Sequence, residues 1–235
     1  MIVLNDLLEY KNLKIYQDNK AFVFSLDSVL LPNFIKLNKN VKRILDIGCG
    51  NAPMPLILST KTDAKIFGVE IQKKIADLAK KSVKLNKLDN QIEIINDDIK
   101  NIDFKEKFDI IISNPPYFKV SKYLSLKEEK LIARHEVKLD LETLIKISAN
   151  NLKNNGVFAI VHRPVRLSEI IILCSKYNLE VKRIEFVYPN LNKEANMVLI
   201  EAIKGANPGL KVLEPIITHE NGKYTDQIKK YFRGE

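Results

Sequence analysis

Residues 114–117 have the types and the order to act on an amino or amide nitrogen. The tetrad Asn114-Pro115-Pro116-Tyr117 directly follows the apolar run Phe108–Ser113. An exocyclic amino group is a poor nucleophile because its lone pair is delocalised, and two acceptors for its hydrogens favour a more pyramidal, more reactive nitrogen. The side-chain oxygen of Asn114 and the carbonyl of Pro115 can be those acceptors, and the two prolines hold them in a stiff turn.

Aromatic residues at the end of the tetrad could hold the group that carries this nitrogen. Tyr117 offers a ring face on which an unstacked base could lie, and Phe118 extends that wall. A rigid turn at the end of a strand also explains two consecutive prolines. We nevertheless expect Asn114, Pro115, Pro116 and Tyr117 to be catalytic.

A glycine turn after an earlier apolar run indicates a ligand close to the main chain. Gly48 and Gly50 follow the run Arg43–Ile47, and they lack Cβ atoms where a nucleoside could approach the backbone. Asp46 lies near the end of the same run and can accept hydrogen bonds. A strand-to-helix turn that needs two glycines but binds no ligand would have the same sequence. Other residues must therefore show whether a ligand binds here.

Two more acids occur where a nucleoside would need them. Glu70 ends the next apolar run, where a carboxylate can bind both ribose hydroxyls. Asp98 follows the third run, so its carboxylate could accept from an adenine amino group while Ile99 packs on the ring. The sequence has neither a Walker motif nor the third glycine of a dinucleotide fingerprint. The pattern therefore predicts a nucleoside ligand without a pyrophosphate.

Short apolar runs alternate with longer amphipathic segments, which is typical of a parallel sheet flanked by helices. The expected strands are Arg43–Ile47, Ile66–Glu70, Ile92–Ile95, Phe108–Ser113 and Gly156–His162. The expected helices are Pro53–Thr60, Gln72–Leu85, Leu139–Asn151 and Val165–Tyr177. Two later runs, Lys182–Tyr188 and Asn196–Ile203, should pair as an antiparallel hairpin. We expect one domain with an extension at 1–40, a catalytic core at 41–204 and an extension at 205–235.

The chain resembles the class I S-adenosylmethionine methyltransferases, closely over residues 43–117, in the ordered set Asp46-Ile47-Gly48-Cys49-Gly50, Glu70, Asp98 and Asn114-Pro115-Pro116-Tyr117. The resemblance implies a Rossmann-like, doubly wound, mostly parallel seven-stranded sheet with an antiparallel edge hairpin. It also implies S-adenosylmethionine as cofactor, held by Asp46, Gly48, Gly50, Glu70, Asp98 and Ile99. The sequence departs from this family at Ala52, where many relatives have a third glycine.

A net charge of +9, from 38 Lys and Arg against 29 acids, favours a polyanionic partner. A general bias of the chain toward lysine would give the same total.

The segment 119–135 mixes basic and aromatic residues, as a nucleic-acid backbone beside a flipped base requires. The candidate substrate-binding residues are Tyr117, Phe118, Lys122, Arg134 and Arg163.

The flanks of the core resemble the bacterial methyltransferases that modify N6 of adenine 37 in a valine tRNA. The resemblance lies in Gln17, Phe22–Phe24 and Asp27–Leu31 ahead of the core, and in Ala133-Arg134-His135-Glu136, His162-Arg163-Pro164, Lys204-Gly205 and the segment Pro215 to Tyr224 further along the chain. This resemblance implies tRNA as the partner. Three alternatives stay open: a protein glutamine N5-methyltransferase, a DNA adenine N6-methyltransferase and a non-catalytic nucleoside-binding protein. Glutamine enzymes usually carry an N-terminal helical domain, for which the residues before Arg43 are too few. DNA enzymes normally add a target-recognition domain, and no segment is long enough for one.

Location and assembly are also predictable in outline. No apolar run approaches the ~18 residues of a membrane span, and residues 1–14 do not read as a secretion signal. We therefore expect a cytoplasmic protein that does not bind membranes and acts as a monomer. Cys49 and Cys174 are far apart and the three histidines have no ligand-like spacing, so neither a disulfide nor a metal is expected.

Overall fold

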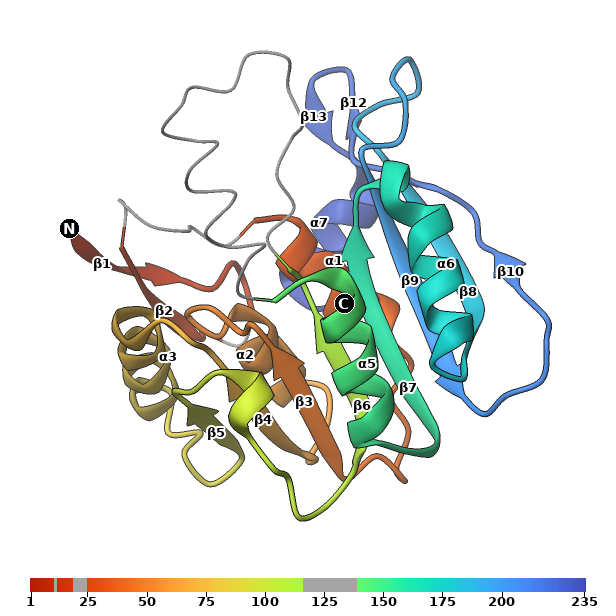
Figure 1. Cartoon of the computed structure of the whole chain (residues 1–235). Coiled ribbons are helices and arrows are strands. Elements are labelled where there is room, and N and C mark those ends of the chain that lie inside the picture. The colour runs from red at the N-terminus through yellow and green to blue at the C-terminus, as the bar shows by residue number, and fades with distance from the viewer. Residues whose placement is uncertain (11, 19–24, 116–138) are drawn as a thin grey trace, which may run out of the picture.

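Helices cover both faces of one central sheet in the computed structural model, which describes residues 1–10, 12–18, 25–115 and 139–235 (Figure 1). The sheet has seven long strands in the order β8-β9-β7-β6-β3-β4-β5, and two short strands pair with β8. These strands are β3 (Arg43–Ile47), β4 (Lys65–Val69), β5 (Ile92–Ile95), β6 (Phe108–Ser113), β7 (Leu152–His162), β8 (Leu179–Tyr188), β9 (Met197–Lys204), β10 (Lys211–Val212) and β11 (Ile216–Ile217). The order confirms the predicted Rossmann-like, doubly wound sheet.

Only β9 among the seven long strands runs antiparallel to its neighbours, β7 and β8. The predicted hairpin of β8 and β9 is therefore confirmed. The outer edge of the hairpin, which is strand β8, is partly covered. Strands β10 and β11 pair with β8 in parallel, at Lys211↔Arg183 and Ile216↔Val187. An edge strand with free backbone groups would be open to pairing with another chain, and these two short strands occupy part of that edge.

The helical elements are α1 (Asp27–Phe34), α2 (Pro53–Ser59), α3 (Lys73–Leu85), α5 (Leu141–Asn151), α6 (Leu167–Lys176) and α7 (Asp226–Arg233), with 3-10 turns η1 (Ile99–Asn101) and η2 (Pro164–Arg166). The four predicted helices correspond to α2, α3, α5 and α6. The sequence did not predict α1, α7 or two small antiparallel ribbons, β1 (Ile2–Asp6) with β2 (Lys14–Asp18) and β12 (His219–Glu220) with β13 (Lys223–Tyr224). No helix in the described part of the chain is long and apolar enough to cross a membrane.

The alternation of side chains along each strand divides the interior into two cores. Ile44 and Ile112 lie in the core beneath α1, α2, α3 and α7, whereas Leu45 and Ile111 lie in the core beneath α5 and α6. Because successive residues of a strand face opposite sides of the sheet, a strand covered on both faces has to be apolar throughout. This is why the sequence shows continuous apolar runs at β3 and β6.

The two ends of the chain meet on the α1 face. The Tyr10 hydroxyl donates to the Tyr231 carbonyl, and Asn33 Nδ2 donates to that hydroxyl at 2.9 Å. Leu7, Tyr10 and Ile228 are almost fully buried in the same core as the apolar side of α1. These contacts hold α1 in place against the rest of the fold. The first turn of α1 in turn contacts the candidate active site.

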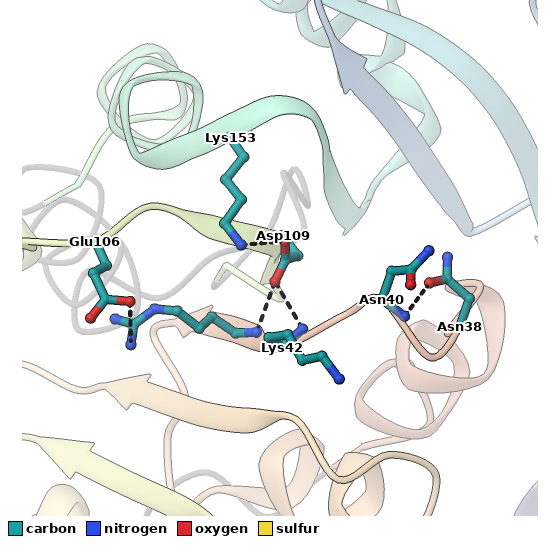
Figure 2. A network of polar contacts seen from close by, with 7 residues as sticks. Asn38, Asn40, Lys42, Glu106, Asp109 and Lys153 are labelled. Carbon is teal, nitrogen blue, oxygen red and sulfur yellow. Dashed lines mark hydrogen bonds and ion pairs between the residues drawn. The ribbon is translucent and has the colours of Figure 1, made fainter.

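Asp109 fixes the register of β6 beside β3 at the edge opposite the carboxyl ends of the strands (Figure 2). Its Oδ2 accepts hydrogen bonds from the backbone nitrogens of Lys42 and Arg43, both at 2.9 Å, and its Oδ1 lies 2.6 Å from Lys153 Nζ. Burial raises the pKa of Asp109, but the hydrogen bonds from Lys153, Lys42 and Arg43 together hold it below its ordinary value. The charged form is therefore the one that the fold stabilises.

Replacing Asp109 with alanine should lower the free energy of unfolding by about 1–3 kcal/mol at neutral pH, because two backbone N–H groups lose a charged acceptor. A lowered pKa in the folded state stabilises the protein above the unfolded pKa, and this contribution is lost as the pH falls through the folded pKa. Urea unfolding at neutral pH and at about pH 3 measures both effects, with Asp103→Ala on the neighbouring loop as the exposed control. An equal loss in the control, or a difference that is as large in acid as at neutral pH, would contradict the role given to Asp109.

Candidate active site

The turn between β3 and α2 leaves open space beside its main chain. Gly48 and Gly50 adopt φ of +77° and +56°, and a Cβ built on either would meet no atom within 4 Å. The nitrogens of Gly48 and Cys49 both donate to the Val69 carbonyl, at 2.9 and 3.0 Å, so the turn is anchored to the end of β4. Ala52 also has a positive φ, 70°, in the left-handed region where glycine is free of steric cost. A ligand can therefore lie directly against this backbone.

Glu70 closes one side of the same turn. Its side chain is largely buried, its Oε2 accepts from Gly50 N at 3.1 Å, and its Oε1 accepts from Gln72 N at 2.8 Å. Each carboxylate oxygen has further acceptor capacity, so these bonds orient the group without using it up. The structure thus places Glu70 next to the glycine turn, as the sequence predicted for a ribose-binding acid.

Asp46 is a buried acid whose two carboxylate oxygens have no hydrogen-bond partner within the described residues. Burial, and then the nearby charge of Glu70, raise the pKa of Asp46 well above its ordinary value. A buried carboxylate without a partner is costly unless a cation or donor comes to it. The arrangement therefore fits a ligand that carries positive charge into the space beside Gly48 and Gly50.

Asp98 and Ile99 follow β5, which pairs with β4, the strand that Glu70 follows. The Asp98 carboxylate accepts from Lys100 N at 3.1 Å, lies 3.2 Å from Lys100 Nζ and keeps 22% of its side chain exposed. Ile99 is almost fully buried in the core beneath α5 and α6. Asp98 therefore keeps part of its side chain accessible at this edge, whereas Ile99 has little surface left for a ring.

Asn114 leaves the carboxyl end of β6 beside the glycine turn. The hydroxyl of Ser113 donates to the Ile47 carbonyl at 2.8 Å, which ties the end of β6 to the residue before Gly48. The Asn114 amide nitrogen donates to the Ser28 hydroxyl of α1 at 3.3 Å, so its Oδ1 stays available as an acceptor. Both Asn114 and Pro115 are half-buried. Pro116, Tyr117, Phe118, Lys122 and Arg134 lie outside the described residues.

Arg163 is partly engaged within the fold. Its guanidinium donates to the Asn196 carbonyl at 2.8 Å, its side chain is half-buried, and burial lowers its pKa. Its backbone nitrogen donates to Nδ1 of His162, whose pKa burial lowers to about 4, with a smaller contribution from Arg166. His162 is therefore neutral at physiological pH. The Arg163 side chain therefore has a role within the fold, between the end of β7 and the segment before β9.

Two residues of the site were missed by sequence reasoning. Ser28 orients Asn114 from 86 positions away, and Asn51 donates from the glycine turn to the Tyr16 carbonyl at 3.0 Å, joining β2 to the site. Asn51 stands within the turn motif, so its position was a usable signal. Ser28 lies in the segment Asp27–Leu31, which contributed to the family resemblance, but its contact with Asn114 left no sequence signal because only the fold brings it to β6.

The comparisons with known proteins agree with this geometry. Residues 23–173 match the family described as methyltransferase small domain. A predicted O-methyltransferase from Agrobacterium tumefaciens has the same fold, with a TM-score of 0.67 and 22% identity over 88% of this chain and 96% of that one. The chain therefore belongs to the methyltransferase small domain family and is a class I S-adenosylmethionine-dependent methyltransferase.

Its relatives within that class carry a more specific name. The chain is 32% identical over 181 residues to the tRNA1(Val) (adenine(37)-N6)-methyltransferase of Bacteroides thetaiotaomicron, across 76% of each protein. It is 28% identical over 225 residues to the protein of the same name in Aeromonas hydrophila subsp. hydrophila, across 95% of this chain and 94% of the relative. The resemblance stated from the sequence motifs is confirmed.

The residues present fit S-adenosylmethionine, which supplies an electrophilic methyl group on a positively charged sulfur. The Asp46 carboxylate oxygens, which have no partner among the described residues, would accept from its cationic amino-acid part, and the Glu70 carboxylate would accept from its ribose hydroxyls. The open space over Gly48 and Gly50 leaves room for its chain along the backbone. These assignments follow from the donor and acceptor chemistry of the site.

Asp46→Asn should stabilise the ligand-free protein by about 0.5–2 kcal/mol while weakening cofactor binding, because it removes a buried charge that only the ligand offsets. Since the pKa of Asp46 is raised in the folded state, its cost to folding grows as the pH rises from the ordinary value of 3.8 through the folded value. The gain in stability should therefore be larger at neutral than at acid pH. Thermal unfolding at both pH values, with and without S-adenosylhomocysteine, measures the gain in stability and the loss of binding. An Asp46→Asn protein that is less stable than the wild type would contradict the role given to Asp46.

Proposed function

We propose that this protein transfers a methyl group to N6 of adenine in tRNA, at adenine 37 of a valine tRNA. The observation that carries the proposal is the placement of Asn114, which leaves β6 beside the glycine turn with its amide nitrogen engaged by Ser28. The named activity of the relatives supports the choice of tRNA. The net charge of +9 is in keeping with a polyanionic substrate.

The residues of the site can promote this reaction without a strong base. The Asn114 Oδ1 and the Pro115 carbonyl accept the two hydrogens of the amino group, so positive charge that develops on N6 during methyl transfer is stabilised. The methylated nitrogen then loses one proton to water, because its positively charged form is strongly acidic. Tyr117 and Phe118 are proposed, from the sequence, to stack on the adenine once it has left its neighbours. Lys122, Arg134 and Arg163 are proposed to contact phosphates.

The test is to incubate the protein with labelled S-adenosylmethionine and three substrates in parallel: unmodified tRNA, duplex DNA and a cell extract freed of nucleic acid. We expect label in tRNA only, with tRNA affinity falling steeply as salt rises. Label in a protein glutamine with none in tRNA would overturn the proposal in favour of glutamine N5-methylation. Label in DNA alone would overturn it in favour of a DNA enzyme.

We also infer that the enzyme acts as a monomer in the cytoplasm. Light scattering coupled to size-exclusion chromatography decides between a monomer and a larger assembly.

A further inference from the structure

Helix α3 carries a row of lysines on one face. Lys73, Lys74, Lys80, Lys81 and Lys84 are all exposed, and Lys87 follows just past the helix end. At about 100° per residue, the five helical lysines lie within an arc of about 120°. The opposite side of α3 is buried against the sheet through Ala76, Leu78, Ala79, Ser82 and Val83. We call this exposed side the α3 lysine face.

Charge is concentrated here beyond what the composition of the chain explains. Residues 73–87 contain six lysines and one acid, a net charge of +5 against +9 for all 235 residues. The acid, Asp77, lies 3.7 Å from Lys73. Helices α5 and α6 are amphipathic as well, yet each carries one glutamate and one lysine. A general bias toward lysine would have filled their exposed positions in the same way.

The lysines of the first turn, and the like charges one turn apart, work against the stability of α3, whereas Lys84 in the last turn suits the helix dipole. Lys73 and Lys74 occupy the first turn, which contains no acid, and Gln72 provides no side-chain cap. Cations at a helix N-terminus oppose the helix dipole, and the pair Lys80 and Lys84 places like charges one turn apart. A sequence that breaks local rules without a visible structural gain points to another use for those residues.

The position of α3 links this face to the active site. The helix begins three residues after Glu70, and the nitrogen of Gln72 is held by the Glu70 carboxylate. From there α3 runs along the flank of the molecule beside β2, to which Ser82 and Asn86 are hydrogen-bonded (Figure 1). Lys73 and Lys84 are separated by about 16 Å along the helix axis, which is enough to follow several phosphates of a nucleic-acid strand.

We propose that the α3 lysine face is a docking surface for the phosphate backbone of the RNA substrate outside the loop that carries the target adenine. This proposal rests on the proposed function, and it assigns to α3 the part of tRNA that continues beyond the active site. The lysines bind by charge and counterion release and therefore do not read sequence.

The test compares two triple variants that lose equal charge. The first is Lys80→Gln, Lys81→Gln and Lys84→Gln on α3, and the control is Lys105→Gln, Lys107→Gln and Lys146→Gln, exposed lysines away from α3. The affinity for full-length tRNA is measured over a range of salt, together with the affinity for S-adenosylhomocysteine and for a short RNA containing only the anticodon loop. The α3 variant should bind full-length tRNA about tenfold to a hundredfold more weakly, with a salt slope flatter by about two to three units.

The affinity of the control variant for full-length tRNA should lie within about threefold of the wild-type value. The affinities of the α3 variant for the short RNA and for S-adenosylhomocysteine should also change by less than about threefold. If the wild-type protein neither binds nor methylates tRNA, the proposed function fails and the docking surface fails with it. If the wild-type protein methylates tRNA and both triple variants bind it equally well, only the docking surface is overturned. An α3 variant that keeps its affinity for tRNA and loses binding to phosphatidylserine vesicles would assign the face to a membrane and also overturn the proposal.

Discussion

Asn114→Ala should lower kcat by about 10²–10³-fold while leaving the affinity for S-adenosylhomocysteine within about twofold of the wild-type value. The amide of Asn114 is proposed to act on the target nitrogen, whereas the acids proposed to bind the cofactor lie on β3, just after β4 and in the loop after β5. Removing one preorganised acceptor therefore affects the transition state and not cofactor binding. Single-turnover methyl transfer to tRNA and calorimetry with S-adenosylhomocysteine measure the two quantities separately.

Three further variants make this result specific. Asn114→Asp should be milder than the alanine variant, because a carboxylate still accepts and the Ser28 hydroxyl can donate to it. Ser28→Ala should cause a smaller fall in kcat, since it loosens the orientation of Asn114 and leaves the acceptor in place. Asn101→Ala, an exposed amide in η1, should have no effect. A kcat for Asn114→Ala within about threefold of wild type would remove Asn114 from the mechanism.

Glu70→Ala should weaken the binding of both S-adenosylmethionine and S-adenosylhomocysteine by about 10²- to 10⁴-fold. Two hydrogen bonds to a charged acceptor contribute roughly 1.5–3 kcal/mol each, which converts to that range of affinity. The variant also removes the acceptor of Gly50 N and Gln72 N, so the glycine turn loses one of the contacts that hold it beside the end of β4. The expected loss therefore includes both direct binding and the shape of the turn.

Calorimetry with a folded protein decides this second prediction. Glu93→Ala removes an exposed glutamate from neighbouring β5 and is the matched control, with expected affinity unchanged. Thermal unfolding of both variants shows whether the turn has collapsed together with the fold. Unchanged cofactor affinity in a stable Glu70→Ala protein would mean that the ribose lies elsewhere.

The sheet was predictable because burial on both faces leaves a signature that does not depend on tertiary detail. β3, β5 and β6 have the bounds expected from their apolar runs, and β4 differs by one residue at each end. The glycine turn was predictable for a similar reason, because its positive φ values require particular residues at particular positions. Local physics determines both features.

The α1 segment was not predictable as a helix from its own pattern. Its residues are buried almost throughout, including Asp27, Ser28 and Pro32, so no amphipathic period marks it. Its surroundings are built by α2, α7 and the Tyr10 region, which come from three distant parts of the sequence. The contact between Ser28 and Asn114 depends on that assembly. The core beneath α5 and α6 and the acids Asp46 and Glu70 follow from local sequence. The hydrogen bond that supports Asn114 depends on the whole fold.

The most direct test of the central claim is mass spectrometry of an unmodified valine tRNA transcript after reaction with the wild-type protein and S-adenosylmethionine. Nuclease fragments locate the methyl group, and nucleoside analysis identifies it. We predict one N6-methyladenosine, in the fragment that contains adenine 37, and its formation about 10²–10³-fold more slowly with Asn114→Ala. A methyl group on another nucleotide, or methylglutamine in a protein with an unmodified tRNA, would contradict it.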